Sequence, residues 1–209
     1  MMLLHKLRQL GRAVKWRRQV ARAVSTQLSL LEDPDALVLG NLSAADESRL
    51  TQLVQRAAAH DGPIVEFGTL FGITTRLIAA RARPDQRVIT IDNFSWNPFG
   101  LPPAVQERFA RGVLRTELAE GRVQLWVGDS AAYRTSDRGP APALVFLDAD
   151  HSYAAVRDEI AWARGRGVPI VCGHDYGVAR FGVTRAVDEA FGKGSVTVGG
   201  TVWSWERRA

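Results

Sequence analysis

From residue 63 onward, short apolar runs alternate with stretches of helical pattern. The apolar runs have the length of buried strands: Ile64–Phe67, Val88–Ile91, Val123–Val127, Leu144–Leu147 and Ile170–Cys172. The stretches between them predict four helices: Thr74–Arg81, Pro103–Glu120, Tyr153–Arg164 and Thr184–Phe191. Alternation of this kind is typical of parallel strands joined by crossover helices. The chain then closes with a predicted β-hairpin: Val196–Val198, a Gly199-Gly200 turn and Val202–Trp205.

The N-terminal part of the chain has a different pattern, which predicts two helices. Apolar residues recur at helical spacing from Leu3 to Val14, so a helix is expected within about residues 1–30. Ser43-Ala44-Ala45-Asp46 has the form of a capping box. The apolar face that follows it predicts a second helix over about residues 43–60.

Positive charge is concentrated in this N-terminal part. The formal net charge is +5, and seven of the 27 cations precede the first acid, Glu32. The rest of the chain contains the remaining 20 cations and all 22 acids, so it is nearly neutral. A basic amphipathic helix over residues 1–24 suits three roles. It can pack on its own domain or a sister subunit of a homo-oligomer, contact an anionic membrane surface or partner, or bind nucleic acid.

The length of 209 residues predicts one domain with an extension. We expect a helical extension over residues 1–60 and an α/β domain over residues 61–209. Hydrophobic residues make up 46% of the chain, which is enough for a core and excludes general disorder. The sequence has neither a secretory signal nor the ~20-residue apolar run of a membrane-spanning helix. Cys172 is the only cysteine, which excludes intramolecular disulfides and favours a reducing cytoplasmic location.

The end of the first predicted strand indicates a ligand site, because ligands of open α/β sheets bind beyond the carboxyl ends of the strands. Gly68 and Gly72 permit a tight turn and a close approach of the ligand. Glu66 would repel a pyrophosphate and favour a ligand that carries an ammonium or sulfonium group. S-adenosylmethionine carries both groups and no phosphate. The glycine spacing also differs from the G-x-G-x-x-G pattern of dinucleotide-binding enzymes.

The next two strands also end in acids. Asp92 follows the second strand, where a carboxylate can accept both hydrogens of a ribose diol. Gly128, Asp129 and Ser130 form a small polar turn after the third strand, suited to the edge of an adenine. Each acid alone suits a helix cap equally well, whereas three at successive strand ends favour a bound cofactor. The predicted cofactor contacts are Glu66, Gly68, Thr69, Gly72, Asp92, Asn93, Gly128, Asp129, Ser130 and Asp148.

These motifs resemble those of a known enzyme class. Residues from about 62 to 205 are similar to class I S-adenosylmethionine-dependent methyltransferases. The segments VFLDADHSYAAVRDEI and VCGHDYG resemble the group that includes macrocin-type sugar O-methyltransferases and cephalosporin hydroxylase-like proteins. The resemblance implies a doubly wound, Rossmann-like sheet of seven strands, mostly parallel, with a C-terminal antiparallel hairpin. It also implies S-adenosylmethionine as the cofactor.

The fourth and fifth strands deliver the residues expected at the reacting end of the site. Asp148, Asp150 and His151 follow the fourth strand, and His174 and Asp175 follow the fifth. Methyl transfer needs an oriented acceptor and removal of its proton. His151 has the better-matched pKa for a general base. The resemblance points instead to Asp150, and both remain candidates.

A divalent cation is a second mechanistic interpretation. Asp148 and Asp175 would provide two carboxylate ligands and leave room for two substrate oxygens. Related metal-using methyltransferases carry Asp-Asp or Asp-Asn after the fifth strand, where this sequence has His174-Asp175. An imidazole in place of an oxygen ligand disfavours Mg²⁺ and favours Mn²⁺, Zn²⁺ or a site without metal.

Aromatic residues flank the predicted site. Asn93–Pro103 is rich in aromatics and prolines, and Phe94, Trp96 and Phe99 are expected to form a lid over the site or a subunit contact. Tyr153 suits either the pocket or the core.

The sequence therefore predicts a methyltransferase that acts on a hydroxyl of a small, sugar-like or polyol-like acceptor. The alternatives are a non-catalytic module that docks through its basic helix, and a nicotinamide-dependent oxidoreductase. Nucleic acid is disfavoured as the substrate, because the body is not basic and lacks the Asn-Pro-Pro-aromatic motif of DNA amino-methyltransferases.

Overall fold

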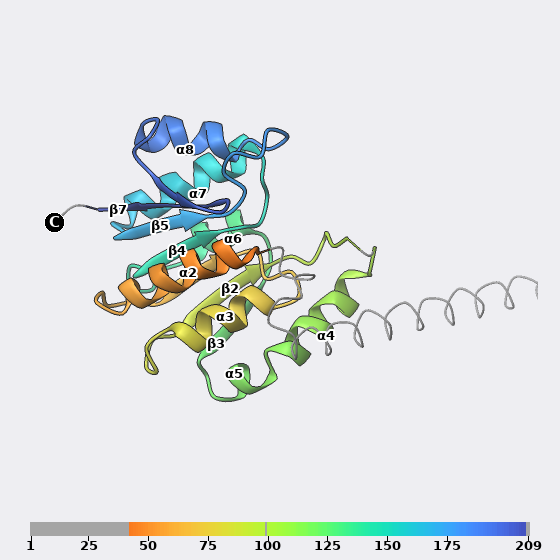
Figure 1. The fold of residues 1–209 in the computed structure, drawn as a ribbon. Helices are drawn as coiled ribbons and strands as arrows, with labels where there is room; N and C mark the ends of the chain where they lie inside the picture. The colour runs from red at the N-terminus through yellow and green to blue at the C-terminus, as the bar shows by residue number, and fades with distance from the viewer. Residues whose placement is uncertain (1–41, 99, 208–209) are drawn as a thin grey trace, which may run out of the picture. The chain divides into compact units, whose positions relative to one another are not determined.

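Seven strands form one mixed sheet in the order β3-β2-β1-β4-β5-β7-β6 (Figure 1). The computed structural model describes residues 42–98 and 100–207. The strands are β1 (Ile64–Phe67), β2 (Val88–Asp92), β3 (Val123–Val127), β4 (Leu144–Leu147), β5 (Ile170–Gly173), β6 (Thr197–Gly199) and β7 (Val202–Glu206). β1 to β5 are parallel, whereas β7 runs antiparallel to both β5 and β6. The predicted fold class and the terminal hairpin are confirmed.

The helices cover both faces of the sheet. They are α2 (Ala44–Ala57), α3 (Ile73–Arg81), α4 (Pro103–Val113), α5 (Arg115–Ala119), α6 (Ser130–Ser136), α7 (Tyr153–Gly165) and α8 (Val183–Phe191). Successive strand residues point to opposite faces, so Ile64 packs with residues of α2 and α3, and Val65 packs with residues of α6, α7 and α8. Two apolar clusters result, one on each face, and β1 contributes residues to both.

Two helical segments differ from the sequence prediction. The predicted helix Pro103–Glu120 is divided into α4 and α5 at Leu114, whose backbone leaves helical geometry at φ −91° and ψ 12°. Leu114 is fully buried in the α2–α3 cluster. The short helix α6 was not predicted, because seven residues are too few to establish a periodic pattern.

Helix α2 begins where the capping box predicts. Ser43 is its N-cap, and the side chains of Ser43 and Asp46 satisfy each other's backbone N–H groups. The helix buries Leu50, Leu53 and Val54 in the same cluster as the sheet. The helix predicted within residues 1–30 lies outside the described residues. Among the residues that the structure describes, no helix is both long and apolar enough to cross a membrane.

Candidate functional site

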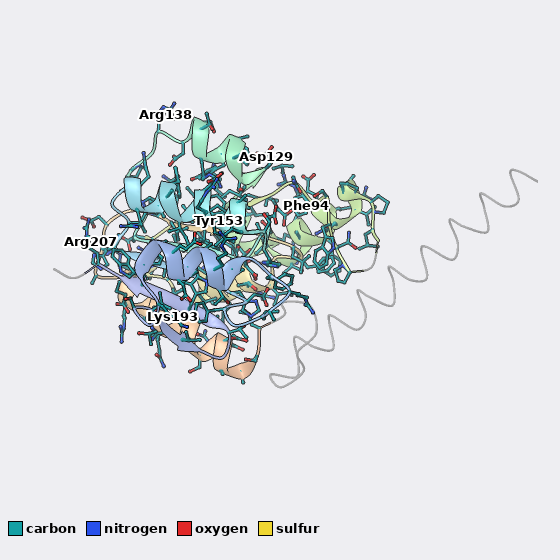
Figure 2. The ribbon with its side chains drawn as sticks, turned by 90° about the horizontal axis from the view of Figure 1, so that it is seen from above. Phe94, Asp129, Arg138, Tyr153, Lys193 and Arg207 are labelled. Atoms are coloured by element: carbon teal, nitrogen blue, oxygen red, sulfur yellow. The ribbon has the colours of Figure 1, made fainter. Side chains whose placement is uncertain are left out.

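The loops after the parallel strands meet at one edge of the sheet, which we call the carboxyl edge. In Figure 2, Phe94 and Asp129 lie on this side, whereas Arg138 and Arg207 lie on the opposite side. Because β2, β1, β4 and β5 are neighbours, the loops that follow them are adjacent. The sheet order therefore brings the predicted site residues to one edge.

The loop after β1 passes close to β4, and this approach requires glycine. Gly68 has φ +101°, and a Cβ placed on it would lie 2.2 Å from the carbonyl oxygen of Asp148. Its N–H donates to the carbonyl of Ile91 at 2.9 Å. Gly72 follows as the N-cap of α3 with φ +83°. Both glycines therefore shape the turn that the sequence predicted as a ligand-binding loop.

Glu66 is buried beneath this loop. Its carboxyl group accepts hydrogen bonds from the hydroxyls of Thr75 and Thr90, the latter at 2.6 Å. Burial raises the pKa of Glu66 to about 8, although the two hydrogen bonds oppose the shift. The residue was expected to present an ionised carboxylate, whereas a pKa of about 8 leaves it largely protonated at pH 7. Its Oε1 atom has no hydrogen-bond partner within the described chain.

Asp92 holds two loops together at the end of β2. Its Oδ2 accepts from the N–H of Leu70, and its Oδ1 accepts from the N–H of Phe94, both at 2.7 Å. Leu70 and Phe94 both have positive φ, 48° and 54°, so each loop turns sharply at the carboxylate. Burial raises the pKa of Asp92, although the backbone hydrogen bonds oppose the shift.

The residues next to Gly68 and Asp92 in the sequence differ in burial. The hydroxyl of Thr69 lies 2.6 Å from that of Thr90, which places Thr69 in the buried network around Glu66. Asn93 is exposed, and its side chain accepts from the N–H of Ser95 at 2.9 Å. Phe94 is only 1% exposed, whereas Trp96 is 64% exposed. The aromatic segment is therefore divided between the core and the surface, and Phe99 lies outside the described residues.

The turn after β3 begins α6. Asp129 is exposed and caps this helix by accepting from the N–H of Ala132 at 2.7 Å. Gly128 has φ +156°, and a Cβ on it would meet the ring of Trp126. The Ser130 hydroxyl accepts from the guanidinium of Arg134 at 3.3 Å. Asp129 therefore caps a helix, which is one of the two roles that the sequence left open. It lies at the carboxyl edge, after the strand next to β2.

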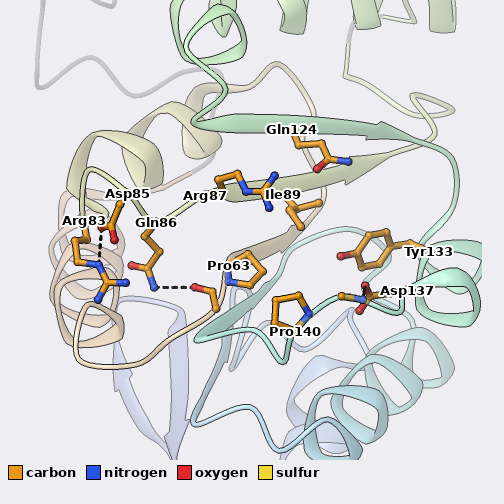
Figure 3. Close-up of a pocket in the computed structure, with 12 residues that line it drawn as sticks. Pro63, Arg83, Asp85, Gln86, Arg87, Ile89, Gln124, Tyr133, Asp137 and Pro140 are labelled. Carbon is orange, nitrogen blue, oxygen red and sulfur yellow. Dashed lines mark hydrogen bonds and ion pairs between the residues drawn. The ribbon is translucent and has the colours of Figure 1, made fainter.

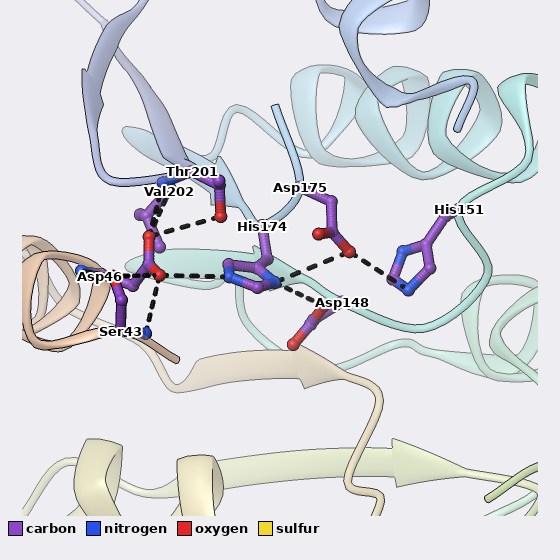
Figure 4. A network of polar contacts seen from close by, with 8 residues as sticks. All are labelled: Ser43, Asp46, Asp148, His151, His174, Asp175, Thr201 and Val202. Atoms are coloured by element: carbon purple, nitrogen blue, oxygen red, sulfur yellow. Dashed lines mark hydrogen bonds and ion pairs between the residues drawn. The ribbon is translucent and has the colours of Figure 1, made fainter. Parts of the chain in front are cut away.

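The loops after β4 and β5 bring charged side chains together in one polar cluster at the carboxyl edge (Figure 4). Nδ1 of His174 lies 3.5 Å from Oδ1 of Asp148 and 3.6 Å from Oδ2 of Asp175. The same Oδ2 lies 3.4 Å from Nε2 of His151. Asp175 has φ +62°, a left-handed conformation that aspartate tolerates, and it directs its carboxylate between the two histidines.

His174 is a buried cation in this cluster. Burial alone would lower its pKa, but the hydrogen bonds and charges of Asp148 and Asp175 outweigh that effect and raise the pKa to about 10. Burial likewise raises the pKa of Asp148, whereas hydrogen bonding and charge from His174 keep that of Asp175 below its ordinary value despite burial. Asp148, His174 and Asp175 each offer one ligand atom, and these atoms lie within 4.8 Å of one another.

Asp150 and Tyr153 do not join this cluster. The Asp150 side chain is exposed and accepts from the N–H of Ser152 at 2.8 Å. The phenol of Tyr153 donates to Glu189 of α8, and the guanidinium of Arg185 lies 4.3 Å from the centre of the Tyr153 ring. The structure therefore gives the side chains of the two candidate bases, Asp150 and His151, different partners.

The sequence did not reveal four contacts of this site. Asp46 was seen only as a capping residue, yet its Oδ2 lies 3.5 Å from Nε2 of His174. Thr75 and Thr90 satisfy Glu66, and the ring of Phe181 lies 4.5 Å from that of His151. No local pattern could show these pairs, because each joins residues from different elements of the fold.

A pocket of about 400 Å³ lies at the other edge of the sheet, before β1, β2 and β4 (Figure 3). Several of its polar side chains are engaged by the fold itself. Gln86 donates to the carbonyls of Ala57, His60 and Gly62, and Arg83 pairs with Asp85 at 2.7 Å. The predicted site residues lie at the carboxyl edge and not in this pocket.

The fold agrees with comparisons to known proteins. The O-methyltransferase from Bacillus cereus, solved in complex with SAH, has a TM-score of 0.61 at 17% identity, over 88% of this chain and 91% of that chain. The O-methyltransferase TomG from Streptomyces achromogenes, solved with SAM, has a TM-score of 0.58 at 20% identity, over 88% and 86%. A TDP-rhamnose 3'-O-methyltransferase of calicheamicin biosynthesis has a TM-score of 0.60 at 18% identity, over 80% and 81%. No curated protein matches the sequence.

These structural likenesses define the class I methyltransferase fold. A family model described as a methyltransferase domain matches residues 65–176, which is more than half of the chain. The chain belongs to this methyltransferase family, and the class predicted from its sequence motifs is confirmed.

Proposed function

We propose that this protein transfers the methyl group of S-adenosylmethionine to a hydroxyl oxygen of a small molecule. The observation that carries the proposal is the position of His151 and Asp175 at the same edge of the sheet as Asp92 and the Gly68 loop. The similar O-methyltransferases support oxygen as the target atom. The TDP-rhamnose 3'-O-methyltransferase and the sequence resemblance support a sugar or another polyol as the acceptor.

The carboxyl edge fits the proposed cofactor. Glu66 has a buried carboxyl oxygen without a partner in the described chain, and Gly68 keeps the loop free of a side chain. A carboxylate has about four acceptor positions, so Asp92 can accept ribose hydroxyls in addition to the two backbone N–H groups that it holds. When bound, S-adenosylmethionine supplies a sulfonium-activated methyl group.

His151 is the proposed general base. Its Nε2 faces Asp175, so the proton on Nε2 is directed at that carboxylate and Nδ1 is left as the proton acceptor. As the acceptor oxygen forms its bond to the methyl carbon and the sulfur–methyl bond breaks, the hydroxyl proton passes to Nδ1. Asp175 then stabilises the imidazolium. Asp150 is disfavoured for this role, because its carboxylate is exposed and bound to the N–H of Ser152.

A metal-assisted variant of this mechanism is favoured by one observation, the convergence of Asp148, His174 and Asp175. These residues would hold a divalent cation, and an ion there would lower the pKa of the acceptor hydroxyl. Two carboxylates and an imidazole suit Mn²⁺ or Zn²⁺ better than Mg²⁺. The proton on His174 competes with the ion for Nδ1, so we expect Mn²⁺ binding by calorimetry to strengthen as the pH rises from 6 to 9. Binding that is absent at both pH values would reject the metal-assisted variant.

Calorimetry with S-adenosylmethionine tests the cofactor assignment. The purified chain should bind S-adenosylmethionine, and Asp92→Ala should abolish binding while circular dichroism shows a folded protein. Asp85→Ala, an exposed acid at the opposite edge, is the matched control and should bind like the wild type. A folded wild-type protein that binds NADH and not S-adenosylmethionine would overturn the proposal in favour of an oxidoreductase.

A second measurement tests the reaction. Formation of S-adenosylhomocysteine should be followed with glycosides and other vicinal diols as acceptors. Turnover that depends on the acceptor supports the proposed activity. Cofactor binding without turnover on any acceptor would favour a non-catalytic module.

A further inference from the structure

We infer that Asp46 is a positioning residue for His174, and that it decides which imidazole nitrogen faces the reacting end of the site. The inference rests on the proposed function, because it assigns His174 to the same cluster as the base. Asp46 belongs to α2 and lies before the segment that matches the methyltransferase family model, residues 65–176. The residue would therefore extend the set of positioning residues to α2.

The carboxylate of Asp46 is fixed from two sides. Its Oδ1 accepts from the N–H groups of Thr201 at 2.6 Å and Val202 at 3.1 Å, in the β6–β7 hairpin. Its Oδ2 accepts from the N–H of Ser43 at 2.8 Å and from the hydroxyl of Ser43 at 2.6 Å. The side chain is almost fully buried, so these contacts leave it one orientation (Figure 4).

The imidazole of His174 lies between this carboxylate and the reacting end. Its Nε2 is 3.5 Å from Oδ2 of Asp46, and its Nδ1 faces Asp148 and Asp175. The ring is 6% exposed, and Nε2 makes no hydrogen bond within the described chain, so the Asp46 carboxylate acts on it as a charged neighbour at ion-pair distance. The carboxylate therefore keeps a proton on Nε2 and directs Nδ1 at the two aspartates.

The orientation of His174 is passed to the base. Asp175 lies between Nδ1 of His174 and Nε2 of His151, so the four residues form a chain from α2 to the base: Asp46, His174, Asp175 and His151. If the ring of His174 turned or changed its protonated nitrogen, the Asp175 carboxylate would lose its contact with Nδ1 of His174. The effect should appear in the chemical step and not in cofactor binding, because the hydrogen bonds of Asp46 go to Ser43 and the β6–β7 hairpin and those of Asp92 go to the loops after β1 and β2.

Asp46→Asn is the informative substitution. The hairpin offers two N–H donors to the amide oxygen and Ser43 offers one, so we expect the oxygen on the hairpin side and the amide NH₂ against Nε2 of His174. A donor there requires Nε2 to act as an acceptor, so the imidazole should lose its Nε2 proton. Ser43→Ala is the matched control, because it removes a hydroxyl from the same capping box and leaves the carboxylate facing His174.

Two readouts on the full chain test the inference. The first is the nitrogen-15 NMR signal of His174, one of only four histidines, assigned by its loss in His174→Gln. Nε2 should carry a proton in the wild type and in Ser43→Ala, and should change to the unprotonated type in Asp46→Asn. The second is the separate measurement of kcat, KM and Kd. We expect Asp46→Asn to lower kcat at least about 10-fold. The KM for the acceptor and the Kd for S-adenosylmethionine should change less than about 2-fold.

The outcomes separate this inference from the proposed function. If both Asp46→Asn and Ser43→Ala lose activity in proportion to their loss of melting temperature, Asp46 has a purely structural role and the inference is overturned. An unchanged His174 signal in Asp46→Asn would also overturn it. A wild-type chain without methyl transfer would reject the proposed function, and the NMR comparison would still decide the role of Asp46. If Asp46→Asn does not fold, the NMR signal of His174 in the wild-type protein decides. A protonated Nε2 supports the inference, and an unprotonated Nε2 overturns it.

Discussion

Glu159 lies on α7 with only 1% of its surface exposed, 3.4 Å from the guanidinium of Arg134. Burial raises its pKa to about 7, although the nearby Ser130 hydroxyl and the charge of Arg134 oppose the shift. Glu66 shows the same effect at the end of β1, where burial also exceeds hydrogen bonding. At both positions the charge of the acid depends on its environment in the fold, so the identity of the residue alone does not give it.

Glu159→Gln should stabilise the protein at alkaline pH. The pKa is higher in the folded than in the unfolded chain, so the folded state binds more protons between about pH 4.5 and 7. The free energy of unfolding therefore falls as the pH rises through this range. The neutral variant should be more stable than the wild type by about 1–3 kcal/mol at pH 8 and show no gain at pH 4. Urea denaturation at both pH values measures this, and a gain that is equal at both would contradict the assignment.

His151→Ala should lower kcat by about 10²–10⁴-fold, the usual contribution of a general base. The Kd for S-adenosylmethionine should stay near the wild-type value, because His151 contacts Asp175 and Phe181 and not the loops after β1 and β2. Asp150→Asn is the comparison and should reduce kcat only a few-fold. The assignment of the base is wrong if the larger loss belongs to Asp150→Asn.

At the scale of elements, both edges of the sheet contain a loop that only glycine can form. Gly68 follows β1 and Gly62 precedes it, and their φ values are +101° and +102°. A Cβ on Gly62 would lie 2.0 Å from the carbonyl oxygen of Ala141, at the edge opposite to the candidate site. The two residues are therefore equivalent in backbone geometry and differ in their distance from the carboxyl edge.

This pair separates stability from cofactor binding. Gly68→Ala and Gly62→Ala should each lower the free energy of unfolding by about 2 kcal/mol or more, because a backbone carbonyl cannot yield to a methyl group. Only Gly68→Ala should weaken S-adenosylmethionine binding, measured by calorimetry below the melting temperature of both variants. Equal weakening in the two variants would show that the Gly68 loop has no specific role in binding.

At the scale of the whole molecule, distant segments of the chain complete one edge of the sheet. Asp46 and Thr201 are 155 positions apart, and their contact brings α2 and the β6–β7 hairpin to the ends of β4 and β5. The strand predictions and the class of the protein followed from periodicity and motifs. The short helix α6 and the break at Leu114 did not, because tertiary packing decides where a short helical segment begins and ends.

The basic N-terminal segment gives a prediction for the whole chain. We expect residues 1–24 to attract anionic surfaces, because their cations have no acids among them. The full chain should float with vesicles that contain phosphatidylserine and not with neutral vesicles. Replacement of Lys15, Arg17 and Arg18 by glutamine should weaken flotation and leave methyl transfer unchanged. A full chain that floats with neither kind of vesicle would reject the membrane-surface role in favour of packing on the protein.

The sequence by itself determined the order of strands and helices, the carboxylates at the strand ends and the methyltransferase class. These features depend on local periodicity and on residue types at fixed positions in a motif. The tertiary structure decided which polar groups are buried and which of them meet. It placed Glu66 out of solvent, gave the side chains of Asp150 and His151 different partners, and set His174 among carboxylates from α2 and from the loops after β4 and β5. Burial and long-range contact belong to the folded chain, because each arises only when elements distant in sequence pack together.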